Sequence, residues 1–488
     1  MKKLEITLDL ENEEKTGLKD KHIDSGGNFK HKTSSQYKLF PFNTKWDNSF
    51  IHEFTYFNGI LGETYRRVLG KELPKELKTD TDYDLNLKNK IVNKATSLTV
   101  TDDDVEGEIK LKQFISELFF EGNNLFCFDK VTLPYLSFKT NNATLKQIGS
   151  FISEVFLSSE DSFENKGSDN ENILYDLVKN SLPELTDKKS KPFGYTIWHK
   201  EVVELFKNDY TFLKSQERAF LKNIGQLLKF YYFIYISKIA LSLDDFYYEN
   251  DHPLYFLLET EVVSKNREGF RSGWSMLEKK IAPLFTHANI LELLNYIKVD
   301  NIPLGNYKEI KEKWDDFSES DKEVLLSKIN ELELFYREAI TMPNTGWDKC
   351  FEVLNNQVEF NKMTCSLEKA IYKFWFVIDY QFKNTARHKP YKSYSLWFIE
   401  FCKANFIKRR GRIGYTLKMD QELLLFLTRL CIGNESKIRL KSLWEELKKR
   451  GVNFDESSKM EVVRLFEKIN LIEKKSDSGD AQYVRTIL

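Results

Sequence analysis

The chain has 488 residues, of which 41% are hydrophobic and 14% aromatic, enough for two or three well-packed domains. Its 73 lysines and arginines nearly balance its 74 aspartates and glutamates, and this net charge of −1 excludes a strongly basic DNA-wrapping protein. Any affinity for nucleic acid must therefore come from local patches. The five cysteines are scattered without a C-x-x-C pair, which argues against a structural zinc site or a disulfide framework and agrees with a reducing cytoplasm.

The first residues, 1–37, are polar and rich in charge, so we expect a loosely held, flexible arm. The chain opens without the apolar core of an export signal, and no apolar run approaches the roughly 20 residues that a bilayer requires. The most apolar run, Phe230–Ser237, is bracketed by lysines and predicts a helix buried on every side. We therefore expect a cytoplasmic protein with no membrane partner.

Apolar residues at helical spacing predict helices through most of residues 38–407. A capping box at Ser320 and Glu323 is expected to begin one of them. We divide this part into an N-terminal mainly helical domain, residues 38–210, and a central aromatic-rich helical domain, residues 211–407. The predicted helices are Phe50–Leu69, Glu108–Phe120, Leu145–Leu157, Ile173–Leu182, Thr196–Phe206, Ser215–Leu243, Ser320–Ile340 and Asn361–Phe382.

The last part, residues 408–488, has the pattern of a winged helix-turn-helix with a small β-hairpin. A helix around Leu423–Leu430 should end at Gly433, and Lys437–Leu440 is extended. A second helix ends at Arg450-Gly451, a third is capped by Asp455 or Ser458, and a hairpin turns at Asp477–Asp480. The predicted fold class is thus mainly α, a multi-helical scaffold followed by a winged helix.

Two groups of cations are candidates for DNA binding. The first lies within eleven positions that contain no acid, and its interspersed glycines would let a phosphate approach backbone N–H groups. The second group, of three cations, lies on the third helix of the winged helix among four acids, Asp455, Glu456, Glu461 and Glu467. A solvated charge run and a protein-docking winged helix are the competing interpretations. The candidates are Lys408, Arg409, Arg410, Arg412 and Lys418, and then Lys459, Arg464 and Lys468.

The sequence offers no recognisable catalytic motif. It lacks the G-x-x-x-x-G-K-[ST] loop of ATPases, and its seven histidines stand singly, so we assign no catalytic residue, no metal site and no cofactor. The nearest approach to a metal-dependent nuclease is Asp102–Asp104 followed by Glu108 and Lys110. An acid-capped helix start is the competing interpretation.

Several segments resemble the G subunit (DptG, also called DndG) of bacterial DNA-phosphorothioation-dependent restriction systems. They are Lys408–Leu417, Leu424–Leu430 and Glu473–Val484, together with the aromatic run Phe230–Tyr235 and Phe40-Pro41-Phe42. The resemblance implies a subunit of an anti-phage defence complex that works with two partner subunits, at least one of them a DNA-translocating ATPase, against DNA lacking the phosphorothioate mark. It implies no catalytic residue for this chain.

The sequence therefore predicts a non-catalytic subunit that is an assembly scaffold and a DNA-contacting module for ATPase or translocase partners. Two alternatives stay open. One is a metal-dependent nuclease with a dispersed site, and the other is a winged-helix transcription regulator. The second alternative leaves the aromatic-rich helical residues before position 408 without a role, because they show no signature of a ligand pocket.

Overall fold

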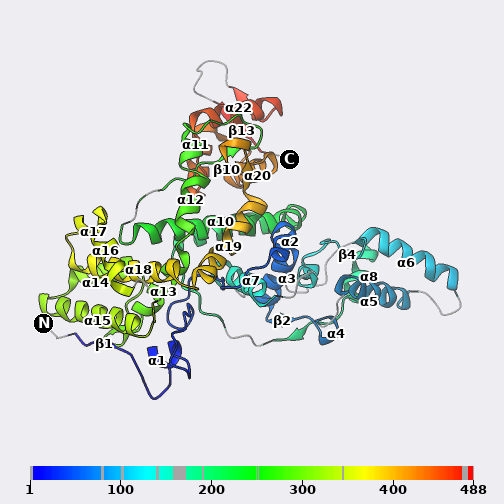
Figure 1. The fold of residues 1–488 in the computed structure, drawn as a ribbon. Helices are drawn as coiled ribbons and strands as arrows, with labels where there is room; N and C mark the ends of the chain where they lie inside the picture. Colours follow the sequence, from blue (N-terminus) through cyan, green and yellow to red (C-terminus); the bar gives the residue numbers. More distant parts are fainter. Residues whose placement is uncertain are drawn as a thin grey trace.

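The structure, a computed structural model, describes residues 4–78, 82–99, 104–138, 142–157, 172–188, 192–248, 250, 252–342, 346–474 and 482–486. These residues form a mainly helical fold with a few small strands, as the sequence predicted. Within the described ranges, no helix combines the length and the apolar character needed to cross a membrane. Figure 1 shows helices on all sides of one long central helix, α10.

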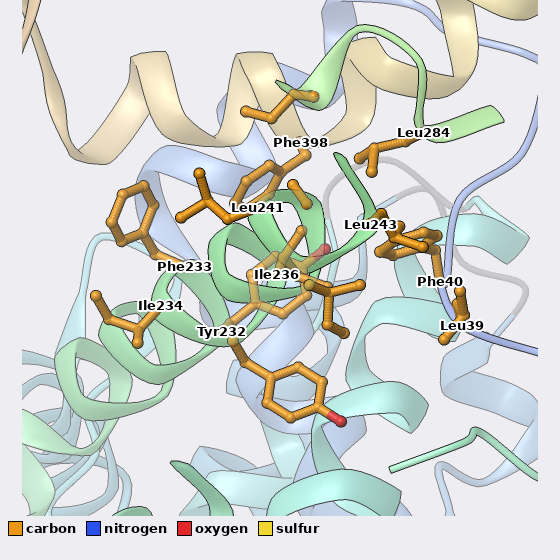
Figure 2. Close-up of a cluster of buried hydrophobic side chains, with 14 of the residues drawn as sticks. Leu39, Phe40, Tyr232, Phe233, Ile234, Ile236, Leu241, Leu243, Leu284 and Phe398 are labelled. Carbon is orange, nitrogen blue, oxygen red and sulfur yellow. The ribbon is translucent and has the colours of Figure 1, made fainter. Parts of the chain in front are cut away.

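Helix α10, Glu217–Asp245, is buried along most of its length because its aromatic run is apolar on every side. Every residue of the run Phe230–Ser237 is buried, as predicted. Figure 2 shows Tyr232 and Phe233 of this helix within a cluster that includes Phe40 and Phe398. The ring of Phe233 stacks on that of Phe398 with 6.1 Å between their centroids. Helices packed directly on α10 include α9 (Lys200–Lys214), α12 (Trp274–Ile281) and α13 (Leu284–Leu294).

The predicted helix Phe50–Leu69 is two helices instead of one. Helix α2 (Ile51–Tyr56) ends and α3 (Asn58–Leu69) begins at Phe57, whose φ of 67° is in the left-handed region. Such a φ is rare for a bulky residue, and the buried Phe57 ring, which packs near Phe401, holds it there. The neighbours of this pair are the 3-10 turn Asn48–Phe50, α7 (Ala143–Phe156) and α19 (His388–Asn405).

Residues 4–37 are part of the fold, and the expectation of a flexible arm was wrong. Strand β1 (Ile6–Leu8) pairs antiparallel with β7 (Ile297–Val299), which continues to β8 (Ile302–Pro303), and Leu18 of the short α1 (Leu18–His22) is fully buried. The carboxylate of Glu292 on α13 accepts hydrogen bonds of 3.0 Å from the backbone N–H groups of Ser35, Gln36 and Tyr37. The polar composition suggested a flexible arm, because the sequence does not show that the carboxylate that fixes this segment, that of Glu292, lies about 255 positions away.

A group of helices at the left of Figure 1 packs on α13 and on β1. Helix α15 begins at Glu319 because the hydroxyl of Ser318 accepts the backbone N–H of Asp321. The predicted capping box, which started from Ser320, was therefore two residues too late. The other helices of this group are α14 (Tyr307–Asp316), α16 (Gly346–Asn355), α17 (Val358–Lys362) and α18 (Ser366–Asn384), and α15 ends at Glu338.

A satellite lobe, seen at the right of Figure 1, has a small core of its own. Its helices α5 and α6 pack through Leu87, Ile91, Ile115 and Phe119, all buried, and this core is separate from the main one. The lobe consists of α4 (Lys75–Lys78), α5 (Tyr83–Ser97), α6 (Val105–Phe119), the strands β3 (Phe120–Glu121) and β4 (Asn124–Leu125), and α8 (Ile173–Ser181). Beside it run the 3-10 turn Lys130–Tyr135 and the paired strands β2 (Lys71–Glu72) and β5 (Thr186–Asp187).

Residues 420–474 and 482–486 form a C-terminal unit at the top of Figure 1. Helix α20 (Gln421–Ile432) ends at Gly433 with φ 62°, and Asp455 caps α22 (Glu456–Lys468), both as predicted. The strands form an antiparallel sheet in the order β11 (Lys437–Arg439), β13 (Gln482–Arg485), β12 (Ile472–Lys474), with α21 (Leu440–Lys449) between β11 and α22. The predicted turn Asp477–Asp480 lies outside the described residues.

The C-terminal unit is fused to the body rather than tethered to it. Leu443 and Val484 belong to the same hydrophobic core as Phe230 of α10. The buried guanidinium of Arg450 donates to both carboxylate oxygens of the buried Asp209 on α9, at 2.9 and 2.6 Å. A guanidinium fork on a carboxylate fixes orientation as well as distance, so α21 is held rigidly on the central helices.

Candidate nucleic-acid interface

The basic stretch predicted from the sequence forms a hairpin of β9 (Ile407–Arg409) and β10 (Tyr415–Met419). Strand β10 pairs on its other side with β6 (Leu257–Leu258). The loop between β9 and β10 contains the 3-10 turn Gly411–Ile413 and closes at Gly414, where φ is 107° and a side chain would be strained. The β9–β10 hairpin therefore carries Lys408, Arg409 and Lys418 on its strands and Arg410 and Arg412 on a short, defined loop.

Arg410 is structural, which corrects its assignment as a phosphate contact. Its guanidinium donates hydrogen bonds of 2.7 to 3.0 Å to the carbonyl oxygens of Leu258, Glu259 and Glu261. Burial lowers the pKa of Arg410 from its usual value, and a guanidinium nevertheless stays charged at neutral pH. Arg410 thus holds the segment after β6 against the hairpin and has few donors left for a ligand.

The two lysines of the hairpin are partly engaged by acids. The ammonium of Lys408 donates to the backbone oxygen of Glu259 at 2.9 Å and lies 3.7 Å from that residue's carboxylate. The ammonium of Lys418 lies 3.5 Å from the carboxylate of Asp420. The sequence from Lys408 to Lys418 contains no acid, which suggested that both lysines would be free to bind phosphate. In the structure, both are instead partly neutralised by nearby carboxylates.

Arg409 and Arg412 are the cations that the hairpin leaves available. Both are exposed, and neither forms an ion pair with the described residues. Tyr415 pairs directly with Arg409 across the two strands, so their side chains lie on the same face, and its ring is 42% exposed. Sequence reasoning missed Tyr415, although an aromatic residue beside a basic run is a known signal of nucleic-acid binding.

Helix α22 offers less free positive charge than its sequence suggested. The ammonium of Lys459 lies 2.7 Å from the carboxylate of Glu456, and Arg464 forms an ion pair with Glu461. Lys468 is exposed and makes no ion pair within the described residues. The structure therefore does not bring the eight predicted cations together as one positive surface.

The N-terminal end of α22 is occupied by the body of the protein. The carboxylate of Asp455 accepts hydrogen bonds from the guanidinium of Arg267 at 3.0 and 2.5 Å and from the backbone N–H of Gly269 at 3.1 Å. These residues lie at the start of α11 (Glu268–Arg271). Burial acts to raise the pKa of Asp455, but the hydrogen bonds, led by that from Arg267, lower it to about 2.

This docking bears directly on DNA reading. In helix-turn-helix complexes the N-terminal residues of the recognition helix reach the base edges. Here the same end packs against α11, and Arg267 is fixed in turn by the carboxylate of Glu261 at 2.6 Å. In this conformation α22 cannot enter a major groove with its N-terminal end.

The nuclease alternative finds little support at Glu108. Its carboxylate pairs with Lys112 at 2.6 Å, and Asp104 caps α6 by accepting the backbone N–H of Gly107 at 2.8 Å, as the acid-capped helix start predicted. Asp102 and Asp103 lie outside the described residues. Across the described ranges, no group of three or more His, Cys, Asp or Glu residues is placed to hold a metal ion.

One histidine lies in a hydrogen-bonded group that the sequence did not reveal. The Nε2 atom of His199 lies 3.2 Å from the Ser242 hydroxyl, and its Nδ1 atom lies 2.9 Å from the Glu201 carboxylate. Ser, His and Glu in this order resemble a hydrolase triad. However, Ser242 lies within α10, where neighbouring N–H groups bond inside the helix, and the N–H of Trp198 donates to the hydroxyl of Tyr235. The hydrogen bonds of this group tie the start of α9 to α10.

Comparison with known proteins adds no assignment: no protein-family model matches the chain, and neither does any curated protein. The resemblance to the G subunit of phosphorothioation-dependent restriction therefore stays a prediction that depends on the segments named above.

Proposed function

We propose that the chain is a non-catalytic subunit of a phosphorothioation-dependent DNA restriction complex, in which it is a scaffold and contributes one DNA contact. The observation that supports this most is where the resembling segments lie. Lys408–Leu417 covers the β9–β10 hairpin, Leu424–Leu430 lies in α20, and the described parts of Glu473–Val484 lie in β12 and β13. The three segments thus belong to one continuous part of the fold.

We further propose that the C-terminal unit is a winged helix. The element order α20, β11, α21, α22, β12, β13 and the sheet order β11-β13-β12 support this assignment. Because α11 covers the N-terminal end of α22, the unit is better suited to holding the scaffold and docking a partner subunit than to reading bases.

The DNA contact of this proposal is made by Arg409 and Arg412. The guanidiniums of Arg409, at the end of β9, and of Arg412, on the glycine-containing loop, can each fork onto phosphate oxygens, and such contacts position a protein without reading sequence. This suits a subunit whose partners move along DNA, because the contact has to tolerate every sequence that passes. The free cations of the hairpin are few, so we expect weak binding by the chain alone.

The scaffold role is supported by the continuity of the core. One hydrophobic cluster extends from Ile6 to Val484 and includes helices from all parts of the chain except the satellite lobe. A partner bound at one point of such a rigid body is therefore held in a fixed geometry relative to the hairpin.

The test is reconstitution with candidate ATPase and translocase partner subunits. The proposal predicts that the chain co-purifies with them, and that cleavage of DNA lacking the phosphorothioate mark requires it, while the chain alone shows neither ATPase nor nuclease activity in Mg²⁺. Cleavage by the chain alone would favour the nuclease alternative. A full-activity complex formed without the chain would refute the proposal.

A further inference from the structure

A large cleft separates the satellite lobe from the main body. It has a volume of about 890 Å³, which is at the upper end of the range for ligand sites. Its walls come from α2 and α3 on one side, from α5 and the β3–β4 strands of the satellite lobe on another, and from the first half of α10 and the start of α20 on a third. Segments that are far apart in the sequence therefore meet around one cavity.

The floor of the cleft is apolar and its lip carries exposed aromatic rings. Leu61, Leu125 and Leu423 line the floor. Tyr56 and Phe126 also line the cleft, and they are 63% and 42% exposed. Large rings left in water at the mouth of a cavity are typical of sites that bind another molecule.

The charge of the lining is predominantly negative. Five carboxylates and the ammonium groups of Lys222 and Lys229 line the cleft. Of the carboxylates, those of Glu121 and Glu422 are exposed and form no ion pair within the described residues, whereas that of Asp420 caps α20 and lies 3.5 Å from the ammonium of Lys418. Lys229 is already engaged, because its ammonium donates to the backbone oxygen of Thr55 at 2.8 Å and burial lowers its pKa to about 8. The carboxylates belong to Glu53, Asp84, Glu121, Asp420 and Glu422.

These features decide between possible occupants. A nucleic acid is disfavoured, because its phosphates would meet the exposed carboxylates of Glu121 and Glu422. A small cation would leave the apolar floor and the aromatic lip unused. A peptide segment can satisfy both, since the stems of lysine and arginine cover apolar surface while their charged ends reach carboxylates or the faces of rings.

We propose that this cleft docks a segment of a partner protein in which lysine or arginine alternates with apolar residues. The cleft is separate from the β9–β10 hairpin, so this proposal does not depend on the DNA contact. Its position between two lobes also makes it suited to a segment that bridges them, since binding there would fix the satellite lobe against the body.

The test uses the full chain and a short fluorescein-labelled peptide in which lysine alternates with leucine and phenylalanine. The cleft variant carries Glu121→Gln and Glu422→Gln, two exposed carboxylates that form no ion pair within the described residues. The matched control carries Glu323→Gln and Glu352→Gln, which are equally exposed and unpaired there but lie on α15 and α16. Both variants change the net charge by the same amount.

We expect the peptide to bind the wild type and the control alike and to bind the cleft variant about tenfold more weakly, measured by fluorescence anisotropy. Replacing Tyr56 and Phe126 with alanine should weaken binding further, and the same peptide with glutamate for lysine should not bind. Equal weakening in the two Gln variants would show that only the overall charge acts and would overturn the proposal. Displacement of the peptide by spermidine at equal charge would overturn it too, because it would indicate a small-cation site.

Discussion

The ion pair between Arg450 and Asp209 should control how firmly the C-terminal unit stays on the body. Both side chains are about 95% buried, and the hydroxyl of Tyr231 adds a third hydrogen bond to the Asp209 carboxylate at 2.5 Å. Replacing Asp209 with alanine leaves the Arg450 guanidinium buried with only Glu446, at 3.0 Å, as a charged partner. We predict that the C-terminal unit then opens far more often than in the wild type.

The free-energy cost of Asp209→Ala follows from the burial of the Arg450–Asp209 ion pair. Removing one partner of a buried ion pair costs about 3–5 kcal/mol, and the remaining contact with Glu446 places this case near the lower limit. A loss of about 3 kcal/mol raises the population of the opened unit by roughly two powers of ten. If the penalty comes from the unpaired charge, adding Arg450→Met to Asp209→Ala should recover part of it, because no buried charge is then left alone.

Hydrogen exchange measured by mass spectrometry separates local from global effects. In Asp209→Ala we expect the amides of α21 and α22 to lose about two powers of ten of protection, while those of α15 on the far side keep theirs. The double variant should lie between the single variant and the wild type. Equal loss in all three helices, or a double variant worse than Asp209→Ala, would refute this reasoning.

Three further predictions concern other contacts. Glu292→Gln puts amide hydrogens opposite the N–H groups of residues 35–37, so we expect faster hydrogen exchange in residues 4–37 and none of this change in the exposed control Glu312→Gln. Arg410→Met should lower the melting temperature because the carbonyl oxygens of residues 258, 259 and 261 each lose one hydrogen bond, whereas Arg412→Met, at an exposed position, should leave it within error. Because the pKa of Asp455 is depressed, the interaction of its carboxylate with α11 stabilises the fold above about pH 4, and this stabilisation is lost as the pH falls towards 2. The difference in melting temperature between the wild type and Asp455→Asn should therefore shrink between about pH 4 and pH 2. A difference that stays constant over this range would contradict the prediction.

The sequence predicted best what depends on neighbours along the chain. The buried helix α10 followed from a run that is apolar on all sides, and the end of α20 at Gly433 and the start of α22 at Asp455 followed from local hydrogen-bonding needs. Each of these signals lies within a few residues of the feature that it predicts. Periodicity and capping therefore carried most of the helical fold.

The sequence could not predict what depends on distant partners. Arg410 looked like a phosphate ligand because its acceptors, the carbonyl oxygens of Leu258, Glu259 and Glu261, lie about 150 residues earlier. Phe57 breaks a predicted helix because its ring finds a buried site in the tertiary structure, and tertiary packing can override local propensity. The sequence does not reveal the cleft for the same reason, since its lining residues come from segments far apart in the chain.

The central claim is that Arg409 and Arg412 on the β9–β10 hairpin, and not Lys459 and Arg464 of α22, contact DNA. It is tested most directly by the salt dependence of duplex binding for three proteins: the wild type, Arg409→Ala with Arg412→Ala, and Lys459→Ala with Arg464→Ala. Each lost phosphate contact lowers the slope of log affinity against log salt by about 0.9, so the hairpin variant should lose up to roughly 1.8. The α22 variant should keep the wild-type slope, because Lys459 and Arg464 are both paired with acids in the wild type. A slope that falls in the α22 variant and stays unchanged in the hairpin variant would contradict the claim.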